Sequence, residues 1–431
     1  HPCSIFQGSR NDFQNAERAE TADFILLAGS RHRRVNPSPS FQSTQSFIRK
    51  GELSMQMMAS GILAQGERGT ARAILTFGQV VDLHSGGLLA VCRAGSSKDC
   101  ADELIEFYRS ADGGRTWSGP VRPFTPPKLN DKAGSLKICY LTELTPGHLL
   151  AASMWIDRTT YPGQPLFNAE TEGCLPMEIL LADSRDDGHT WSEWRHIPMP
   201  AEIGPASLTN PILKLGDGSL AMSIETNKHY ADSSRWYQKA VYFHSADGGQ
   251  RWSAPVVAGQ DPSGRIFNWD MRACVAPDGR IATFAWTYDT QTTSYLNIQR
   301  RISRDGGHSW SAPEDLGITD QAGPPAVLAD GRVVLAWVDR FVSHSIRARV
   351  AAGVDAPFDP TSEVVVYTHD NEAKRDDNTG NLLAEMGVWS FGLPSATALP
   401  DGDVLVVYYA GDDGAMDIRW ARLRPDLEIG R

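Results

Sequence analysis

An eight-residue motif that recurs four times restricts what this chain can fold into more than any other feature of its sequence. Each copy has Ser at its first position, Asp at its third, Gly at its fifth and Trp at its eighth, and the copies span 110–117, 184–191, 245–252 and 303–310. Each copy follows an apolar, strand-like run. An Asp side chain can accept hydrogen bonds from backbone N–H groups of its own turn, and Gly permits positive φ there. We therefore interpret the motif as a structural turn and not as a catalytic site.

A second, independent signal is a turn followed by an apolar strand, which occurs six times. The turns start at intervals of 61, 71, 61, 52 and 71 residues, at Gly86, Gly147, Gly218, Gly279, Gly331 and Gly402. Such an interval holds one four-stranded antiparallel sheet with its loops. Because four short strands cannot bury both faces of a sheet alone, six such units are expected to pack around an axis and close. The sequence therefore predicts an all-β, six-bladed β-propeller over residues 55–431.

Residues 1–54 differ from the rest of the chain. They show neither the period of a strand nor that of a helix, and they contain no recognisable signal peptide. We expect this segment to be a non-native or disordered extension. The sequence does not assign the protein to a cellular compartment, and bacterial cytoplasm and periplasm are the two alternatives.

Charge and composition exclude several classes of function. The chain has 41 Lys and Arg against 52 Asp and Glu, a net charge of −11, which argues against binding of nucleic acid. The sequence contains no run of 18 apolar residues, the length needed to span a membrane. No His pair has zinc-ligand spacing, and no Gly-rich phosphate loop is present, so we expect neither a metal nor a cofactor. The expected partner is a glycan or a small acidic sugar, and the oligomeric state is left open.

The Ser-x-Asp-x-Gly-x-x-Trp motif is the Asp-box, and from about Met55 to its C-terminus the chain resembles the sialidase (BNR-repeat) superfamily. This resemblance implies an exo-acting glycoside hydrolase on a six-bladed propeller. It also implies an Arg at a strand end of the first repeat, followed by an Asp-x-x-Asp loop whose first Asp is the acid/base. Arg93 and Asp99 match these positions, with Asp102 as the second candidate for the acid/base.

Three positions depart from the sialidase pattern. Thr76-Phe77-Gly78 stands where the family has its first arginine, Leu393 stands where it has the Tyr nucleophile, and Asp270 stands where it has the assisting Glu. Without the Tyr, attack by water with inversion becomes the alternative to a retaining mechanism. Inversion needs two carboxyl groups about 6.5–9.5 Å apart.

The innermost strands of a propeller carry side chains to the mouth of its axis. In Trp269-Asp270-Met271-Arg272, the acid and the base at i and i+2 share one face of a strand beside an aromatic platform. We expect Asp270 to face Asp99 across the mouth, Trp269 to stack on the sugar and Arg272 to pair with a sugar carboxylate. The further candidates for substrate contacts are Lys137, Tyr140, Asp157, Arg158, Glu172, Glu225 and Trp389.

The leading hypothesis is an exo-glycosidase that removes a terminal acidic sugar such as sialic acid, with Asp99 and either Asp270 or a wall glutamate as the carboxyl pair. A second hypothesis is a polysaccharide lyase, or another sugar-processing activity, that uses Tyr140 or Tyr230 as base. A third is a glycan-binding propeller without catalysis, because a fold alone does not fix chemistry.

Overall fold

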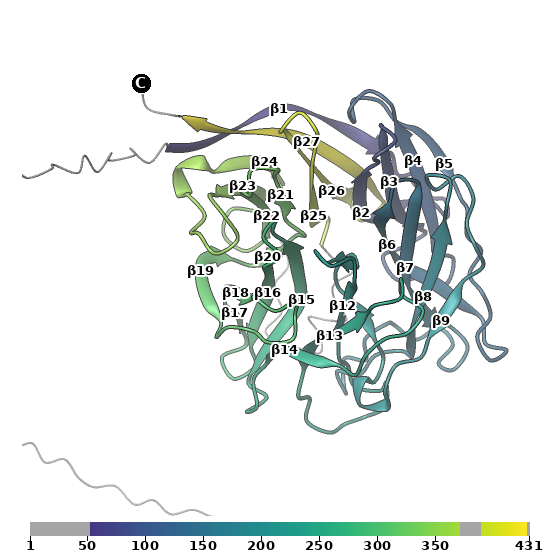
Figure 1. Cartoon of the computed structure of the whole chain (residues 1–431). Coiled ribbons are helices and arrows are strands. Elements are labelled where there is room, and N and C mark those ends of the chain that lie inside the picture. The colour runs from purple at the N-terminus through teal and green to yellow at the C-terminus, as the bar shows by residue number, and fades with distance from the viewer. Residues whose placement is uncertain (1–51, 371–388, 429–431) are drawn as a thin grey trace, which may run out of the picture. The chain divides into compact units, whose positions relative to one another are not determined.

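The computed structural model describes residues 52–370 and 389–428, which are β-structure apart from two short 3₁₀ helices, η1 (Ala201–Ile203) and η2 (Pro360–Ser362). The sheets are arranged around a central axis, as Figure 1 shows. The expected all-β, propeller-type arrangement is therefore confirmed. No helix in the described ranges has the length and apolar character needed to cross a membrane.

The strands form five sheets. The largest has eight strands in the order β25 (Phe391–Ala398), β26 (Val404–Asp412), β27 (Ala415–Glu428), β2 (Ile74–Asp82), β3 (Leu88–Gly95), β4 (Leu104–Ser110) and β5 (Ser118–Val121), with β1 (Glu52–Ala64) also paired to β27. The four-stranded sheet has the order β6 (Gly134–Thr145), β7 (His148–Asp157), β8 (Met177–Ser184) and β9 (Arg195–Ile197).

Three sheets have five strands each. In the first, β10 (Ser207–Leu208) and β11 (Leu213–Lys214) both pair with β12 (Leu220–Glu225), which is followed by β13 (Lys239–Ser245) and β14 (Val256–Gln260). The second contains β15 (Ile266–Val275), β16 (Ile281–Asp289), β17 (Ser294–Tyr295), β18 (Asn297–Ser303) and β19 (Glu314–Thr319). In the third, β20 (Gln321–Ala322) and β21 (Ala326–Val327) pair with β22 (Val333–Asp339), followed by β23 (Ser345–Ala351) and β24 (Val364–Thr368).

The number of sheets corrects the expectation of six separate blades. The eight-stranded sheet contains two antiparallel sets, β2–β5 and β25–β27 with β1, which are joined by one parallel bridge between Ile74 and Met416. Five hydrogen-bonded sheets result among the described residues. Pairing of β1 with β27 starts at Glu52, so residues 52–54 belong to the fold and not to the expected extension. Residues 1–51 of that extension lie outside the described residues.

The core lies along the second strands of the repeats. The six turn-and-strand signals of the sequence start β3, β7, β12, β16, β22 and β26, in which nearly every residue is buried. A strand buried on both faces needs a continuous apolar run and not an alternating one. These strands therefore form the buried middle of each sheet.

The hydrogen bonds of the eight-residue motif agree with a structural turn. In the fourth copy the Ser303 hydroxyl donates to Asp305 Oδ1 at 2.8 Å and accepts from the buried Gly307 N–H at 2.8 Å. Asp305 Oδ1 also accepts from the backbone N–H of Ser309 at 2.8 Å. Trp310 packs on Tyr242, with ring centroids 5.0 Å apart. The side chains of Ser303, Asp305 and Ser309 thus serve the turn itself.

Ser303→Ala is expected to lower the free energy of unfolding by about 1–3 kcal/mol, because the buried Gly307 N–H loses its acceptor. Chemical denaturation measures this change. Arg304→Ala removes an exposed side chain of the same turn that makes no hydrogen bond within it, and is the control, with an effect within about 0.5 kcal/mol. Equal effects of the two substitutions would show that the Ser303 hydroxyl does not hold the turn.

Candidate active site

Bulges in four innermost strands turn side chains toward one cavity. The bulge residues are Phe77 in β2, Lys137 in β6, Asp270 in β15 and Leu393 in β25, and all four line the cavity. Phe77, Asp270 and Leu393 have positive φ, at 55°, 45° and 46°. A bulge bends its strand and redirects a side chain, and bulges are common beside active sites.

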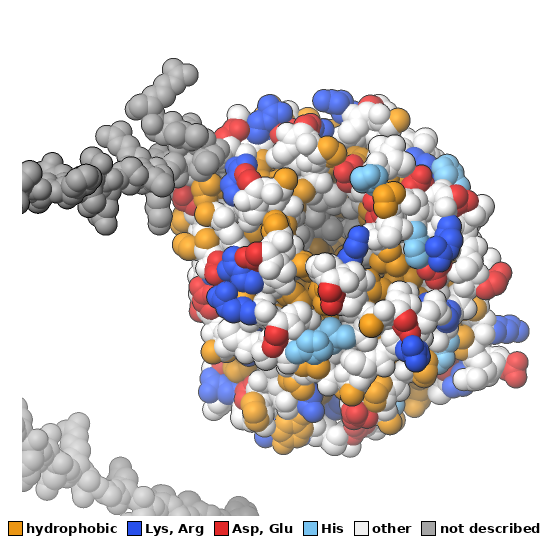
Figure 2. Space-filling model, viewed as in Figure 1, with side chains coloured by type: hydrophobic (Ala, Val, Ile, Leu, Met, Phe, Trp, Pro, Cys, Tyr) orange, Lys and Arg blue, Asp and Glu red, His pale blue; other side chains and the backbone are white. Residues whose placement is uncertain are grey.

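The cavity has a volume of about 520 Å³, within the range of about 300–1,000 Å³ that is typical of ligand sites. Figure 2 shows a hollow near the middle of one face, with hydrophobic side chains around it. Its charged lining residues are Lys98, Asp99, Lys137, Arg158, Glu225, Asp270 and Arg340. Its aromatic lining residues are Phe77, Tyr161, Phe167, Trp236, Trp269, Trp286, Trp389 and Tyr409.

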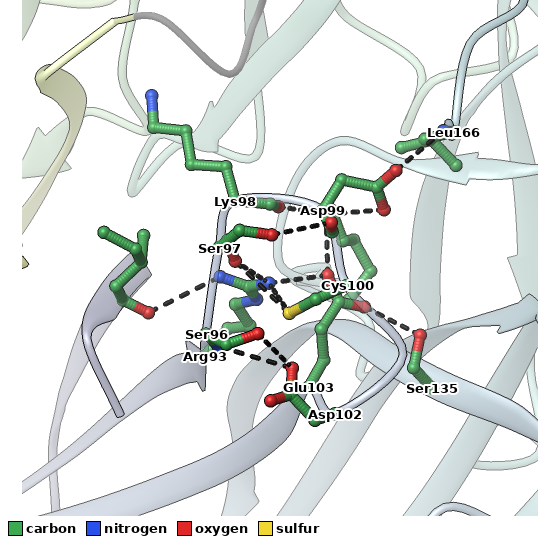
Figure 3. Close-up of polar contacts among 12 residues, drawn as sticks. Arg93, Ser96, Ser97, Lys98, Asp99, Cys100, Asp102, Glu103, Ser135 and Leu166 are labelled. Carbon is green, nitrogen blue, oxygen red and sulfur yellow. Dashed lines mark hydrogen bonds and ion pairs between the residues drawn. The ribbon is translucent and has the colours of Figure 1, made fainter. Parts of the chain in front are cut away.

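Asp99 lies on the loop between β3 and β4 and is held by three donors. Its Oδ1 atom is 2.6 Å from Arg158 Nη2 and 3.4 Å from Lys137 Nζ. Its Oδ2 atom accepts the backbone N–H of Leu166 at 2.7 Å, as Figure 3 shows. Burial acts to raise the pKa of Asp99, but Lys137, Arg158 and the Leu166 N–H outweigh burial and lower this pKa. Asp99 is therefore ionised at neutral pH in this arrangement.

Glu103 is a fully buried carboxylate that holds the cations around Asp99. Its Oε1 atom is 2.8 Å from Arg93 Nη2 and 2.7 Å from Lys137 Nζ, and its Oε2 atom is 3.1 Å from Arg158 Nη2. Burial acts to raise the pKa of Glu103, but Lys137, Arg93 and Arg158 outweigh it and lower this pKa. One buried anion thus positions two cations that reach the cavity and a third, Arg93, that does not.

Glu225 and Asp270 form a second acidic group at the cavity. The backbone N–H of Asp270 donates to Glu225 Oε2 at 3.0 Å, so the two residues are neighbours in the cavity wall. Burial, and secondly the negative charge of Asp270, raise the pKa of Glu225 to about 8. Glu225 is therefore protonated at neutral pH, in contrast to Asp99.

Arg272 does not reach the cavity. It is buried, with its guanidinium donating to the Tyr140 hydroxyl at 3.0 Å and to the backbone oxygen of Thr209, and its Nη2 atom lies 3.3 Å from Asp270 Oδ1. The second donor to Asp270 is the Gln321 amide. Arg272 thus pairs with Asp270 from outside the cavity, and Tyr140 accepts a hydrogen bond from Arg272.

Tyr409, Lys98 and Arg340 form a polar cluster that the sequence analysis missed. Lys98 Nζ donates to the Tyr409 hydroxyl at 3.0 Å and to the backbone oxygen of Trp389. A Cβ atom at Gly392, which has φ of 152°, would lie 2.8 Å from Arg340 Nη2 and 3.1 Å from the Tyr409 hydroxyl. Gly392 therefore leaves the space that these two side chains occupy.

The structure places seven of the expected site residues at the cavity and six elsewhere. The seven are Asp99, Lys137, Arg158, Glu225, Trp269, Asp270 and Trp389. The six that do not line it are Arg93, Asp102, Tyr140, Asp157, Glu172 and Arg272.

Each of the remaining corrections has a physical reason. Asp102 is exposed and accepts from the Ser96 hydroxyl at 2.9 Å, so it caps its own loop. Asp157 is buried and accepts the backbone N–H groups of Thr159 and Thr160. Glu172 Oε2 lies 3.9 Å from Lys228 Nζ, outside the cavity lining.

One signal could have found Arg340. A polar or charged residue stands at or just after the end of several buried second strands, as Arg158 follows β7, Glu225 ends β12 and Arg340 follows β22. All three residues line the cavity, so a charged residue at the C-terminal end of a buried second strand marks the cavity wall. Among the described residues, no group of three or more His, Cys, Asp or Glu is arranged to hold a metal ion.

Comparison with known proteins gives information on the fold. The sequence matches no protein-family model and no curated protein. Similar solved structures include a Dyadobacter fermentans protein of unknown function, with a TM-score of 0.66 and 20% identity over 86% of this chain and 100% of that one. The intramolecular trans-sialidase from Ruminococcus gnavus has a TM-score of 0.59 and 15% identity over 85% of this chain and 97% of its own. A Trypanosoma rangeli sialidase has a TM-score of 0.59 and 11% identity over 85% of this chain and 60% of its own. The fold is therefore sialidase-like.

Glu103→Gln is expected to lower the free energy of unfolding by about 3–5 kcal/mol, because it leaves buried cations without their shared counter-charge. Thermal and chemical denaturation measure the loss. Asp102→Asn, one residue away and exposed, is the control and is expected to have an effect within about 0.5 kcal/mol. A Glu103→Gln protein as stable as the control would contradict a structural role for this network.

Proposed function

We propose that this protein is an exo-acting glycoside hydrolase of the sialidase superfamily that removes a terminal acidic, sialic-acid-like sugar. The observation that carries this proposal is the split between two carboxyl groups of one cavity. Glu225, with its pKa raised to about 8, is protonated at neutral pH, while the pKa of Asp99 is lowered. Carboxyl groups whose environments separate their pKa values in this way can serve as acid and base.

In the proposed reaction Glu225 is the proton donor. Its proton goes to the glycosidic oxygen as the bond from that oxygen to the anomeric carbon breaks. Water attacks the anomeric carbon and passes a proton to Asp99, which Arg158 and Lys137 keep ionised. Of the two roles in the acid/base assignment, Asp99 thus keeps that of base, and the role of acid passes to Glu225.

The acidic group of the sugar is assigned to Lys98 and Arg340 in place of Arg272. Both residues line the cavity, whereas Arg272 is buried behind Asp270. Burial, and then the charges of Arg340 and Lys137, lower the pKa of Lys98. A carboxylate bound beside it would favour the charged form of Lys98 and pair with it.

The lyase alternative loses the two bases that the sequence suggested. Tyr140 is buried with its hydroxyl bound to Arg272, and Tyr230 is not among the cavity residues. Tyr409 does line the cavity, but burial raises its pKa to about 12, which disfavours a phenolate at neutral pH. Hydrolysis therefore has the better-supported acid and base.

Glu225→Gln is expected to lower kcat/KM by about 10²–10⁴-fold on an alkyl glycoside of an acidic sugar, because the leaving alcohol then lacks a proton donor. In the native enzyme, activity should fall as the pH rises through about 8, where Glu225 loses its proton. That fall should be absent from the residual activity of Glu225→Gln.

Glu172→Gln is the matched control, since Glu172 lies outside the cavity lining. Release of reducing sugar from methyl α-glycosides of sialic acid measures both variants. Undiminished activity of Glu225→Gln, or an equal loss in the control, would contradict the assigned proton donor.

A further inference from the structure

Four tryptophans form a continuous row on one wall of the cavity. Their ring centroids are 6.3 Å apart for Trp236 and Trp269, 5.8 Å for Trp269 and Trp286, and 5.6 Å for Trp286 and Trp389. All four line the cavity. We call this set the tryptophan row.

The tryptophan row is an apolar wall of which only a small part of each ring is exposed, because each of the four residues is at most 6% exposed and their rings pack on neighbouring rings. A sugar stacks one of its faces on one aromatic ring, while its hydroxyls require donors and acceptors around its edge. The apolar residues Phe167 and Leu208 also line the cavity and extend its apolar surface. A ligand that fits this wall has an apolar part in addition to its sugar.

The cations lie at the Trp389 end of the row. Arg340 Cζ is 4.2 Å from the centroid of the Trp389 ring, and Lys98 Nζ donates to the Trp389 backbone oxygen. Glu225 is positioned near Trp269, because it accepts the N–H of Asp270, the next residue along the chain. Along the row from Trp389 to Trp236, the cations that would bind the acidic group therefore come first, the proton donor Glu225 second and Trp236 last.

We propose that the substrates of this site are acidic sugars with an aromatic leaving group, whose ring lies against Trp236. This inference rests on the proposed function and specifies its substrate class. With the sugar carboxylate at Lys98 and Arg340 and the glycosidic oxygen at Glu225, the leaving group extends toward Trp236. Aromatic rings pair favourably with an indole in edge-to-face or offset arrangements, beyond the gain from the area that they bury.

The test compares the benzyl and methyl α-glycosides of N-acetylneuraminic acid. The two leaving alcohols have similar acidity, so a difference in KM reports contacts with the ring and not intrinsic reactivity. The benzyl glycoside is expected to have a KM about tenfold lower, equivalent to about 1.4 kcal/mol. Trp236→Leu should bring the ratio of the two KM values close to one, while Trp236→Phe should keep most of it.

Trp310→Phe is the matched control, because Trp310 packs on Tyr242 in a motif turn and does not line the cavity. Its KM ratio should equal that of the native enzyme. Equal KM values for the two glycosides in the native enzyme, or a benzyl preference that survives Trp236→Leu, would overturn the proposal.

Calorimetric titration with 3-phenylpropionate and hexanoate separates this inference from the proposed function. Both probes carry a carboxylate, but only the first carries an aromatic ring. If neither glycoside is hydrolysed, the proposed function fails for this sugar, yet tighter binding of 3-phenylpropionate that Trp236→Leu abolishes still supports the aromatic subsite. If the glycosides are hydrolysed and the probes bind equally, the function stands and the aromatic subsite is refuted.

Discussion

Bulges in the innermost strands decide which side chains meet at the centre of this fold. A regular strand would alternate its side chains between the two neighbouring sheets, and none of them would be directed along the axis. Phe77, Asp270 and Leu393 adopt positive φ at these bulges, a conformation that costs a non-glycine residue free energy. Backbone strain of this kind persists where the surrounding sheets enforce it, and here it coincides with the cavity.

The buried charges around the cavity follow from that placement. Lys137 reaches the cavity from a bulge of β6. The carboxylates of Glu103 and Asp99 pair with Lys137, and Glu103 also pairs with Arg158. Because this group contains more cations than a single carboxylate can neutralise, Asp99 is stabilised in its ionised form. Glu225, in contrast, is buried beside another carboxylate, Asp270, and keeps its proton. Burial with cations and burial with an anion thus give two carboxyl groups different states in one cavity.

The sequence was sufficient for the parts of the structure that depend on local patterns. The turn motif and the apolar runs identified the buried second strands. The resemblance of the first-repeat loop to the sialidase pattern pointed to Asp99, which lines the cavity. Arg272 was misplaced because the alternation rule puts residues i and i+2 on one face, whereas the pairing register shifts between Trp269 and Arg272. The bulge directs Asp270 to the cavity and leaves Arg272 in the wall.

Other features depend on contacts between distant segments and carry no local signal. Tyr409 reaches the cavity from the second strand of its repeat because Gly392 opposes it without a side chain. The protonation of Glu225 depends on burial and on Asp270, 45 residues away. The sheet count depends on one bridge between Ile74 and Met416, which are joined only when the two ends of the chain meet.

The central claim is that Glu225 carries a proton at neutral pH inside this cavity. Infrared difference spectroscopy tests it directly, since a protonated carboxyl group has a C=O stretch that a carboxylate lacks. The native protein should lose one such band as the pH rises through about 8, and the band should be absent from Glu225→Gln. A native spectrum without that band at neutral pH, or a band that persists in Glu225→Gln, would contradict the assignment of Glu225 as the proton donor.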